Sequence, residues 1–337
     1  MTSDLVLHSE GQLGRLGGMV VPAMIADAGE HASRRFLEFF VANISNLNTR
    51  NAYARAVGHF CSWCESRSLG LHQFTPIAVA AYIEQFAATH SAPTVKQHLA
   101  AIRMLFDWLV IGQVVPHNPA ASVRGPKHIV KKGKTLALSA DQARELLKSI
   151  PIIETDEKTG VETTLLLGLR DRALIATMIY SFARVSAVVN MDVEDYWQNG
   201  KRWWLRLHEK GGKHHEVPAH HKVDEYLDAY LNAAGIAGVG KTPLFRSAAR
   251  NSGRLTDRRM DRRNALEMVK RRAKLAGLPA KTCCHSFRAT GITAYLGNKG
   301  TLEKAQAIAA HESPRTTKLY DRTSDEITLD EIERIVI

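Results

Sequence analysis

Six residues in the second half of the chain have side chains that could catalyse chemistry at a phosphate group, and they occur in a characteristic order and spacing. His285 and Arg288 form an H-x-x-R pair, His311 comes 23 residues after Arg288, and Tyr320 comes nine residues later. A single H-x-x-R would be a weak signal, because short motifs recur by chance. The ordered set is far more specific, and it consists of Arg184, Lys210, His285, Arg288, His311 and Tyr320.

These residue types match the needs of a phosphodiester under nucleophilic attack. The negative charge of such a phosphate spreads over its non-bridging oxygens, so catalysis requires positioned cations above all. Arg184 and Arg288 offer planar forks of donors that stay charged at any working pH. The hydroxyl of Tyr320 can attack phosphorus and hold it covalently, which saves the bond energy for rejoining. No carboxylate cluster is needed, so no metal ion or other cofactor is implied.

The order R…K…H-x-x-R…H…Y resembles that of the tyrosine recombinases, the family of phage integrases, Cre and the Xer proteins. The resemblance runs from about Ser33 to Tyr320. It implies a site-specific recombinase that cuts and rejoins duplex DNA through a 3′-phosphotyrosyl intermediate, in integration, excision or resolution. Tyr320 would be the nucleophile, Lys210 the general acid for the departing 5′ oxygen, and His285 the base or proton relay. The phosphate would be bound by the other three residues of the set, Arg184, Arg288 and His311.

One position departs from the family pattern. Members usually carry an acidic residue three positions after the first arginine, and Ala187 stands there in this chain. The loss bears on fine positioning rather than on the reaction itself. A type IB topoisomerase and a telomere resolvase share the same chemistry and remain alternatives, although the two-domain layout is more like that of the simple recombinases. A catalytically silent DNA-binding relative is a further alternative, against which the presence of Lys210 and Tyr320 argues.

Composition agrees with a protein that binds DNA. The net charge of +11 favours polyanionic partners through phosphate contacts. Four cysteines in 337 residues do not make a disulfide framework, so a reducing, cytoplasmic, nucleoid-associated location is expected. No signal peptide or apolar run long enough to cross a membrane is evident.

The chain is expected to be mainly α-helical, with two domains able to clamp duplex DNA. A glycine-rich leader covers residues 1–32, a helical core-binding domain of the SAM-like type 33–125, and a basic linker 126–135. A mixed α/β catalytic domain follows at 136–322, and a C-terminal exchange helix at 323–337. Thr49 is a plausible N-cap in the first domain, and the Ser139–Gln142 pair is a capping box that opens the first helix of the second. The alternation of residues 203–208 predicts a β-hairpin that carries Lys210 near its tip.

Basic side chains outside the catalytic set are candidate DNA contacts. Nine lysines and arginines lie between positions 254 and 274, directly before the H-x-x-R pair. The C-x-x-C of Cys61 and Cys64 lies within an amphipathic helix pattern, which favours core cysteines over a metal site. The candidate DNA contacts are Arg50, Arg55, Lys96, Arg103, Lys131, Lys132, Lys213, Arg258, Arg259, Arg262, Arg263 and Arg271.

The final residues predict a helix that packs on a neighbouring protomer. Thr328 and Glu331 form a capping box, and an apolar stripe follows it to the end of the printed sequence. Docking on its own catalytic domain is the alternative. The family resemblance favours the neighbouring protomer, because it implies protomers that exchange C-terminal segments; it also implies a homotetramer on two paired core sites. The leader is expected to be too short for a separate arm-binding domain, so the protein is expected to act on a short core site alone. The residues of the stripe are Leu329, Ile332, Ile335 and Val336.

Overall fold

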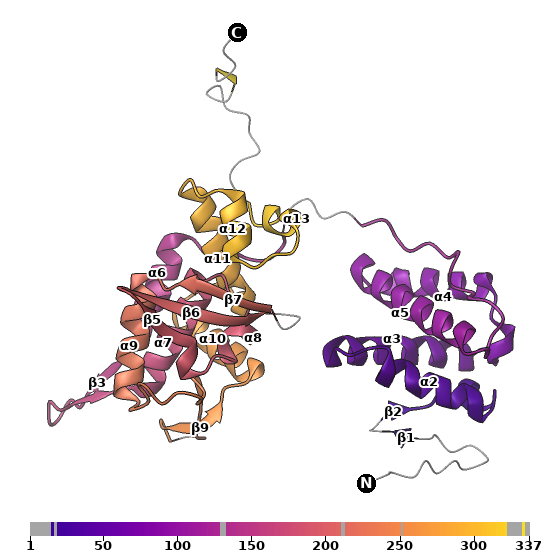
Figure 1. Ribbon diagram of the computed structural model, residues 1–337, viewed down its shortest axis with the longest axis horizontal. Helices are drawn as coiled ribbons and strands as arrows, with labels where there is room; N and C mark the ends of the chain where they lie inside the picture. The colour runs from indigo at the N-terminus through magenta and orange to yellow at the C-terminus, as the bar shows by residue number, and fades with distance from the viewer. Residues whose placement is uncertain are drawn as a thin grey trace. The chain divides into compact units, whose positions relative to one another are not determined.

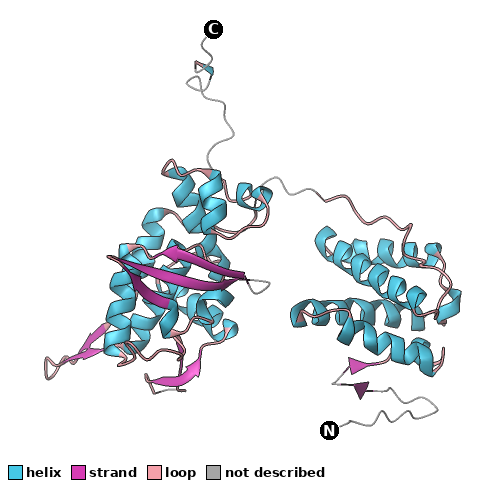
Figure 2. Ribbon diagram, in the orientation of Figure 1, coloured by secondary structure: helices cyan, strands magenta, loops and turns pink. Residues whose placement is uncertain are grey.

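The computed structural model describes residues 15–16, 19–128, 133–209, 213–250, 252–321 and 332–333, and it divides into two compact units, residues 1–129 and 130–337. Both units are built mainly of helices, with short antiparallel strands (Figures 1 and 2). Among the described residues, no helix is both long enough and apolar enough to cross a membrane. The mainly helical, two-domain expectation is confirmed.

The first unit is a helical bundle around an aromatic core. Phe60, Tyr82 and Phe106 pack edge to face at its centre, with Phe60 in contact with both of the others. Cys61 and Cys64 are buried in this core, as expected, and burial raises the pKa of Cys64 to about 12. The elements are β1 (Arg15–Leu16), β2 (Met19–Val20), α1 (Ala23–Ala26), α2 (Glu30–Ala42), α3 (Leu47–Glu65), a short 3-10 helix (Leu71–Gln73), α4 (Pro76–Thr89) and α5 (Ala92–Ile111).

Two details of this unit differ from the sequence expectations. Helix α3 begins earlier than expected, because the side chain of Asn46, not that of Thr49, accepts hydrogen bonds from the first turn. The expected leader also contributes to the core, since Ile25 of α1 is 1% exposed. Helix α2 begins before position 33 as well. The repeated glycines before position 19 predict a leader outside the core, although the short apolar segment that follows them is buried in it.

The second unit surrounds one central helix. Helix α7 (Leu166–Tyr180) is buried on almost all sides, which explains why its sequence lacks a polar face. The expected capping box opens α6, where Ser139 and Gln142 bond reciprocally. The other helices are α6 (Ala140–Ser149), α8 (Val185–Val189), a short 3-10 helix (Val193–Asp195), α9 (His221–Ala233), α10 (Arg262–Leu275), α11 (Cys284–Gly297), α12 (Leu302–Ile308) and α13 (Pro314–Lys318).

The main sheet of this unit has three antiparallel strands in the order β5–β6–β7. The expected hairpin is present as β6 (Arg202–Glu209) and β7 (Lys213–Pro218), with β5 (Tyr196–Asn199) added on the other edge of β6. Two further two-stranded pairs are β3 (Ile153–Thr155) with β4 (Glu162–Thr164), and β8 (Arg246–Ala248) with β9 (Leu255–Arg259). The connection between β6 and β7, with Lys210, lies outside the described residues.

Candidate active site

Five of the six catalytic candidates lie near one another in the second unit, and the sixth, Lys210, lies outside the described residues. The hydroxyl of Tyr320 hydrogen-bonds Nε2 of His285 at 2.8 Å, and it also contacts Arg288. The ring of His311 stacks on that of Tyr320, with centroids 5.7 Å apart and planes 9° from parallel. The last three helices of the unit, α11, α12 and α13, gather at one end of it and bring these groups together (Figure 1).

His285 and Arg288 share one face of the first turns of α11, because residues three apart lie side by side on a helix. Arg288 is 1% exposed, and its two terminal nitrogens donate to backbone carbonyls: Nη1 to Phe182 and Nη2 to Ala309, the latter at 2.6 Å. Its Nε is buried and has no hydrogen-bond partner in the described parts of the chain. Burial, with Arg184 as the second cause, lowers the pKa of Arg288 to about 10.

The backbone next to this site adopts a conformation that L-residues rarely take. Phe182 has a φ of 56° and Ala310 a φ of 47°, and both lie in the left-handed region. Phe182 turns the chain between α7 and α8, and its carbonyl accepts from Arg288. Ala310 directly precedes His311. Unfavourable backbone conformations of this kind persist where the surroundings fix them, as they do at functional sites.

The two histidines are held neutral by their surroundings. Desolvation, followed by Arg288 and Arg184, lowers the pKa of His285. Burial and the same two arginines lower the pKa of His311 to about 3. Nδ1 of His311 pairs with the hydroxyl of Thr317 at 2.8 Å, which fixes the imidazole ring beside the tyrosine. A neutral His285 can accept the proton of the Tyr320 hydroxyl at Nε2.

Arg184 directly precedes α8, with its side chain 33% exposed. It lies close enough to lower the pKa of His285, Arg288 and His311. Its Nη1 donates to Glu209, the last residue of β6, whose side chain is 4% exposed. Glu209 was not among the candidate residues. Its signal lay in the alternation of β6, which places Leu205, Leu207 and Glu209 on one inward face.

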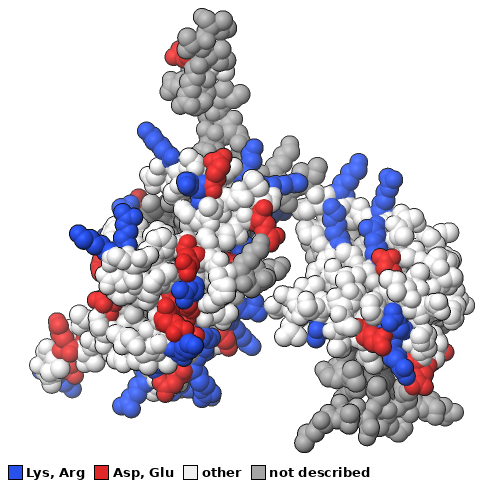
Figure 3. Space-filling model, viewed as in Figure 1, with Lys and Arg blue, Asp and Glu red and all other residues white. Residues whose placement is uncertain are grey.

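The candidate DNA contacts fall into three groups. Exposed ones are Arg55, Lys96, Arg258, Arg262, Arg263 and Arg271. Figure 3 shows lysines and arginines gathered around β9, intermixed with acidic side chains. Lys131 and Lys132 lie outside the described residues, as does the side chain of Lys213.

The side chains of three arginines of the candidate set donate to backbone carbonyls elsewhere in the protein. Arg50 donates to the carbonyl of Val41 in the last turn of α2 and to that of Ile44 just after this helix. Arg103 donates to Ala120 and Val123. A contact between any of these arginines and DNA stays a prediction.

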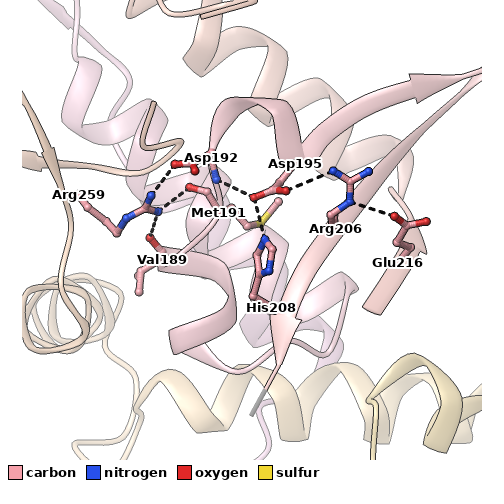
Figure 4. Close-up of polar contacts among 8 residues, drawn as sticks. All are labelled: Val189, Met191, Asp192, Asp195, Arg206, His208, Glu216 and Arg259. Atoms are coloured by element: carbon pink, nitrogen blue, oxygen red, sulfur yellow. Dashed lines mark hydrogen bonds and ion pairs between the residues drawn. The ribbon is translucent and has the colours of Figure 1, made fainter. Parts of the chain in front are cut away.

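Arg259 is the third of them, and it joins the end of β9 to the end of α8 and the turn that follows that helix (Figure 4). It donates to the carbonyls of Val189 and Met191 at 2.9 and 2.8 Å and pairs with the Asp192 carboxylate at 2.5 Å. Nearby, the Asp195 carboxylate meets His208 at 3.3 Å and Arg206 at 3.8 Å. These contacts hold the end of β9 against the end of α8, and the short 3-10 helix before β5 against β6.

Comparison with known proteins gives consistent matches over both units. Residues 137–326 match the model of the phage integrase family, and residues 34–112 match the phage integrase N-terminal SAM-like domain. The tyrosine recombinase XerC of Chlamydia muridarum is 30% identical over 262 residues, which cover 77% of this chain and 76% of that protein. XerC of Myxococcus xanthus is 26% identical, covering 77% and 81%.

Solved structures share the fold at lower sequence identity. The XerH site-specific recombinase bound to its difH substrate aligns with a TM-score of 0.65 and 17% identity, covering 91% of this chain and 84% of that one. A lambda integrase dimer bound to a COC′ core site aligns with a TM-score of 0.63 and 17% identity, covering 88% and 79%. A lambda integrase tetramer bound to a Holliday junction gives a TM-score of 0.63 at 16% identity, covering 88% and 78%.

Proposed function

Since the chain belongs to the phage integrase family of tyrosine recombinases, which cut and rejoin DNA at specific sites, we propose that the group around Tyr320 is its active site. One observation carries this proposal above all others. The Tyr320 hydroxyl bonds to a neutral histidine and touches a buried arginine, so nucleophile, proton acceptor and phosphate ligand already lie together. Chemistry at a phosphodiester needs these three groups in contact.

In the cleavage step, the Tyr320 oxygen attacks phosphorus and forms the 3′-phosphotyrosyl bond. The tyrosine proton passes to Nε2 of His285, which is free to accept it because its lowered pKa keeps the ring neutral. The bond from phosphorus to the 5′ oxygen breaks, and Lys210 supplies the proton that this oxygen takes. In rejoining, a 5′ hydroxyl attacks the phosphotyrosine and every proton moves in the opposite direction.

The negative charge on the phosphate oxygens is stabilised by Arg184, Arg288 and His311. Arg288 uses both terminal nitrogens within the protein, which leaves the buried Nε as the donor that lacks a partner among the described residues. A buried donor without a partner costs free energy, and a phosphate oxygen would satisfy it. His311, with Nδ1 bonded to Thr317, would donate through Nε2. The neutral form expected from its low pKa carries one ring proton for this purpose.

The DNA duplex would be held outside the catalytic group by exposed basic side chains of both domains, including Arg55, Lys96, Arg258 and Arg271. We place the reaction in the cytoplasm, on DNA of the nucleoid. We further propose that four copies act on two paired sites, which the lambda integrase tetramer on a Holliday junction supports by analogy of fold. The segment 323–337 would link neighbouring copies. Of its residues, only Ile332 and Glu333 are described, and Ile332 is 51% exposed.

The experiment has two stages. The target site is first found by sequencing the DNA that the bound protein protects from nuclease. A nicked suicide duplex built on that site should then trap an SDS-stable protein–DNA adduct. Tyr320→Phe should form no adduct and yet bind the site almost normally, since the ring and its stacking on His311 are kept. A phenylalanine variant that still forms adducts would exclude Tyr320 as the nucleophile.

The linking role of the last segment is tested separately. Deletion of residues 327–337 should leave binding to a half-site nearly unchanged, weaken cooperative filling of the full site, and lower recombination. Equal loss of half-site binding, or unfolding, would assign the segment to its own domain.

A further inference from the structure

The buried carboxylate of Glu209 lies at the edge of the proposed active site and has no role in the reaction as described so far. Leu205, Leu207 and Glu209 form one inward row on β6, with exposed fractions of 1%, 0% and 6%. A carboxylate at the end of an apolar row costs free energy unless a cation compensates it. Arg184 supplies that cation through Nη1.

The same carboxylate also eases the repulsion between the two arginines. Arg184 lowers the pKa of Arg288, and Glu209 acts in the opposite direction on the same group. Two guanidinium groups held close to one phosphate repel each other before the phosphate arrives. A single buried anion beside them offsets part of that repulsion without occupying the space of the substrate.

Arg184 has little else to fix its direction. It stands at the start of the short helix α8, where the side chain three positions later is the fully buried methyl group of Ala187. Among the described residues, its hydrogen bond to Glu209 is the one made by its guanidinium, and it leaves Nε and Nη2 available. A third of the side chain is exposed, so without this anchor the arginine could adopt several rotamers.

We propose that Glu209 is the positioning residue of Arg184, and that from strand β6 it takes over the part that an acidic residue at position 187 would play. The inference rests on the proposed role of Arg184 at the phosphate. Glu209 touches neither DNA nor the reacting atoms in this assignment. It fixes the direction of one guanidinium fork so that the remaining donors face the phosphate when DNA binds.

The first test is Glu209→Gln, which keeps the shape and one acceptor but removes the charge. The rate constant of single-turnover adduct formation on the suicide duplex should fall about tenfold to a hundredfold, the range for loss of a charged hydrogen bond. Site binding should stay equal or become tighter, since an anion near the DNA is removed. Glu209→Asp should recover part of the rate. Unchanged cleavage, or a fall in cleavage matched by weaker binding and a lower melting temperature, would overturn the proposal.

Glu216→Gln is the matched control. Glu216 lies on the neighbouring strand β7, pairs with Arg206 at 3.0 Å and is 46% exposed. The Glu216→Gln variant therefore has the same chemical change at a residue that does not contact Arg184. Its cleavage rate should stay near that of the unmodified protein.

A double substitution shows whether Glu209 works through Arg184. Arg184→Lys replaces the directional fork by a compact point charge, so cleavage should fall yet stay measurable. In that background, Glu209→Gln should cost less than about threefold, because little directionality remains to be lost. An equal loss in both backgrounds would refute the positioning role. If Arg184→Lys itself leaves cleavage unchanged, the proposed role of Arg184 fails. If it slows cleavage while Glu209→Gln does not, only the present inference fails.

Discussion

Substitution of Gly133 should slow catalysis, although this residue lies far before Tyr320 in the sequence. Its backbone N–H donates to the carbonyl of Leu319 at 2.9 Å, directly before Tyr320. A Cβ atom at position 133 would lie 2.6 Å from that carbonyl oxygen, closer than the 3.0 Å that real Cβ contacts respect. In Gly133→Ala the two backbones must therefore separate by roughly 0.4 Å or more, which strains or breaks the hydrogen bond.

The displacement should reach Tyr320, the proposed nucleophile. The carbonyl of Tyr320 accepts from Thr293, and its N–H donates to Thr317, so the residue is fixed on its other sides. A shift of Leu319 thus strains the Tyr320 peptide rather than dissipating in a free loop. Loss of one backbone hydrogen bond costs about 0.5–1.5 kcal/mol of stability. Misplacement of a reacting group by up to an ångström slows a reaction by as much as about a hundredfold.

The assay is single-turnover adduct formation on the suicide duplex, beside site binding and thermal unfolding. Gly133→Ala should reduce the cleavage rate about tenfold or more and lower the melting temperature by only a few degrees. Gly297→Ala is the control, because a Cβ there meets no atom within 4 Å. A Gly133→Ala protein that folds and cleaves within about threefold of the unmodified rate would show that this contact does not position the tyrosine.

Four further predictions concern the proton transfers and the arginines. Lys210→Ala should slow cleavage of ordinary DNA far more than cleavage of DNA with a 5′-phosphorothiolate, because sulfur leaves without a proton; equal slowing would exclude the general acid. The lowered pKa of His285 means that its neutral form persists below the ordinary value of about 6.5, so the cleavage rate should stay level down to that pH and fall only in more acidic buffer; a midpoint at or above 6.5 would contradict the base assignment. Arg259→Ala should lower the free energy of unfolding by about 1–3 kcal/mol in denaturant titrations, because it removes bonds to two carbonyls and Asp192. Arg258→Ala should leave stability unchanged and reduce the salt dependence of DNA binding by about one ion.

The sequence was most informative where residue type, order and local pattern acted together. The alternation in β6 and the capping box at Ser139 are local signals, and both elements formed as predicted. The proximity of His285 to Tyr320 joins residues 35 apart, and the ordered motif had already suggested it. Asn46 displaced Thr49 as the cap of α3, because both residue types are good caps and spacing alone did not separate them.

Tertiary contacts account for the remaining differences. Arg259 belongs to a basic stretch, and charge in a sequence does not reveal that its guanidinium also donates to carbonyls inside the fold; its contact with DNA stays a prediction. The pairing of Glu209 with Arg184 joins a strand end to a helix start, 25 positions apart. The clash that a side chain at Gly133 would meet depends on a carbonyl far along the chain. None of these contacts follows from periodicity.

The use of both terminal nitrogens of Arg288 within the protein matters for the design of a catalytically inactive variant that still binds its DNA site. This side chain ties the turn after α7 to the end of α12 through two carbonyls. Its removal would loosen both segments, and a lysine could not span the two acceptors with the same geometry. An inactive variant made at position 288 would thus lose shape together with chemistry. The hydroxyl of Tyr320 is the better atom to delete, since the scaffold keeps the ring in place without it.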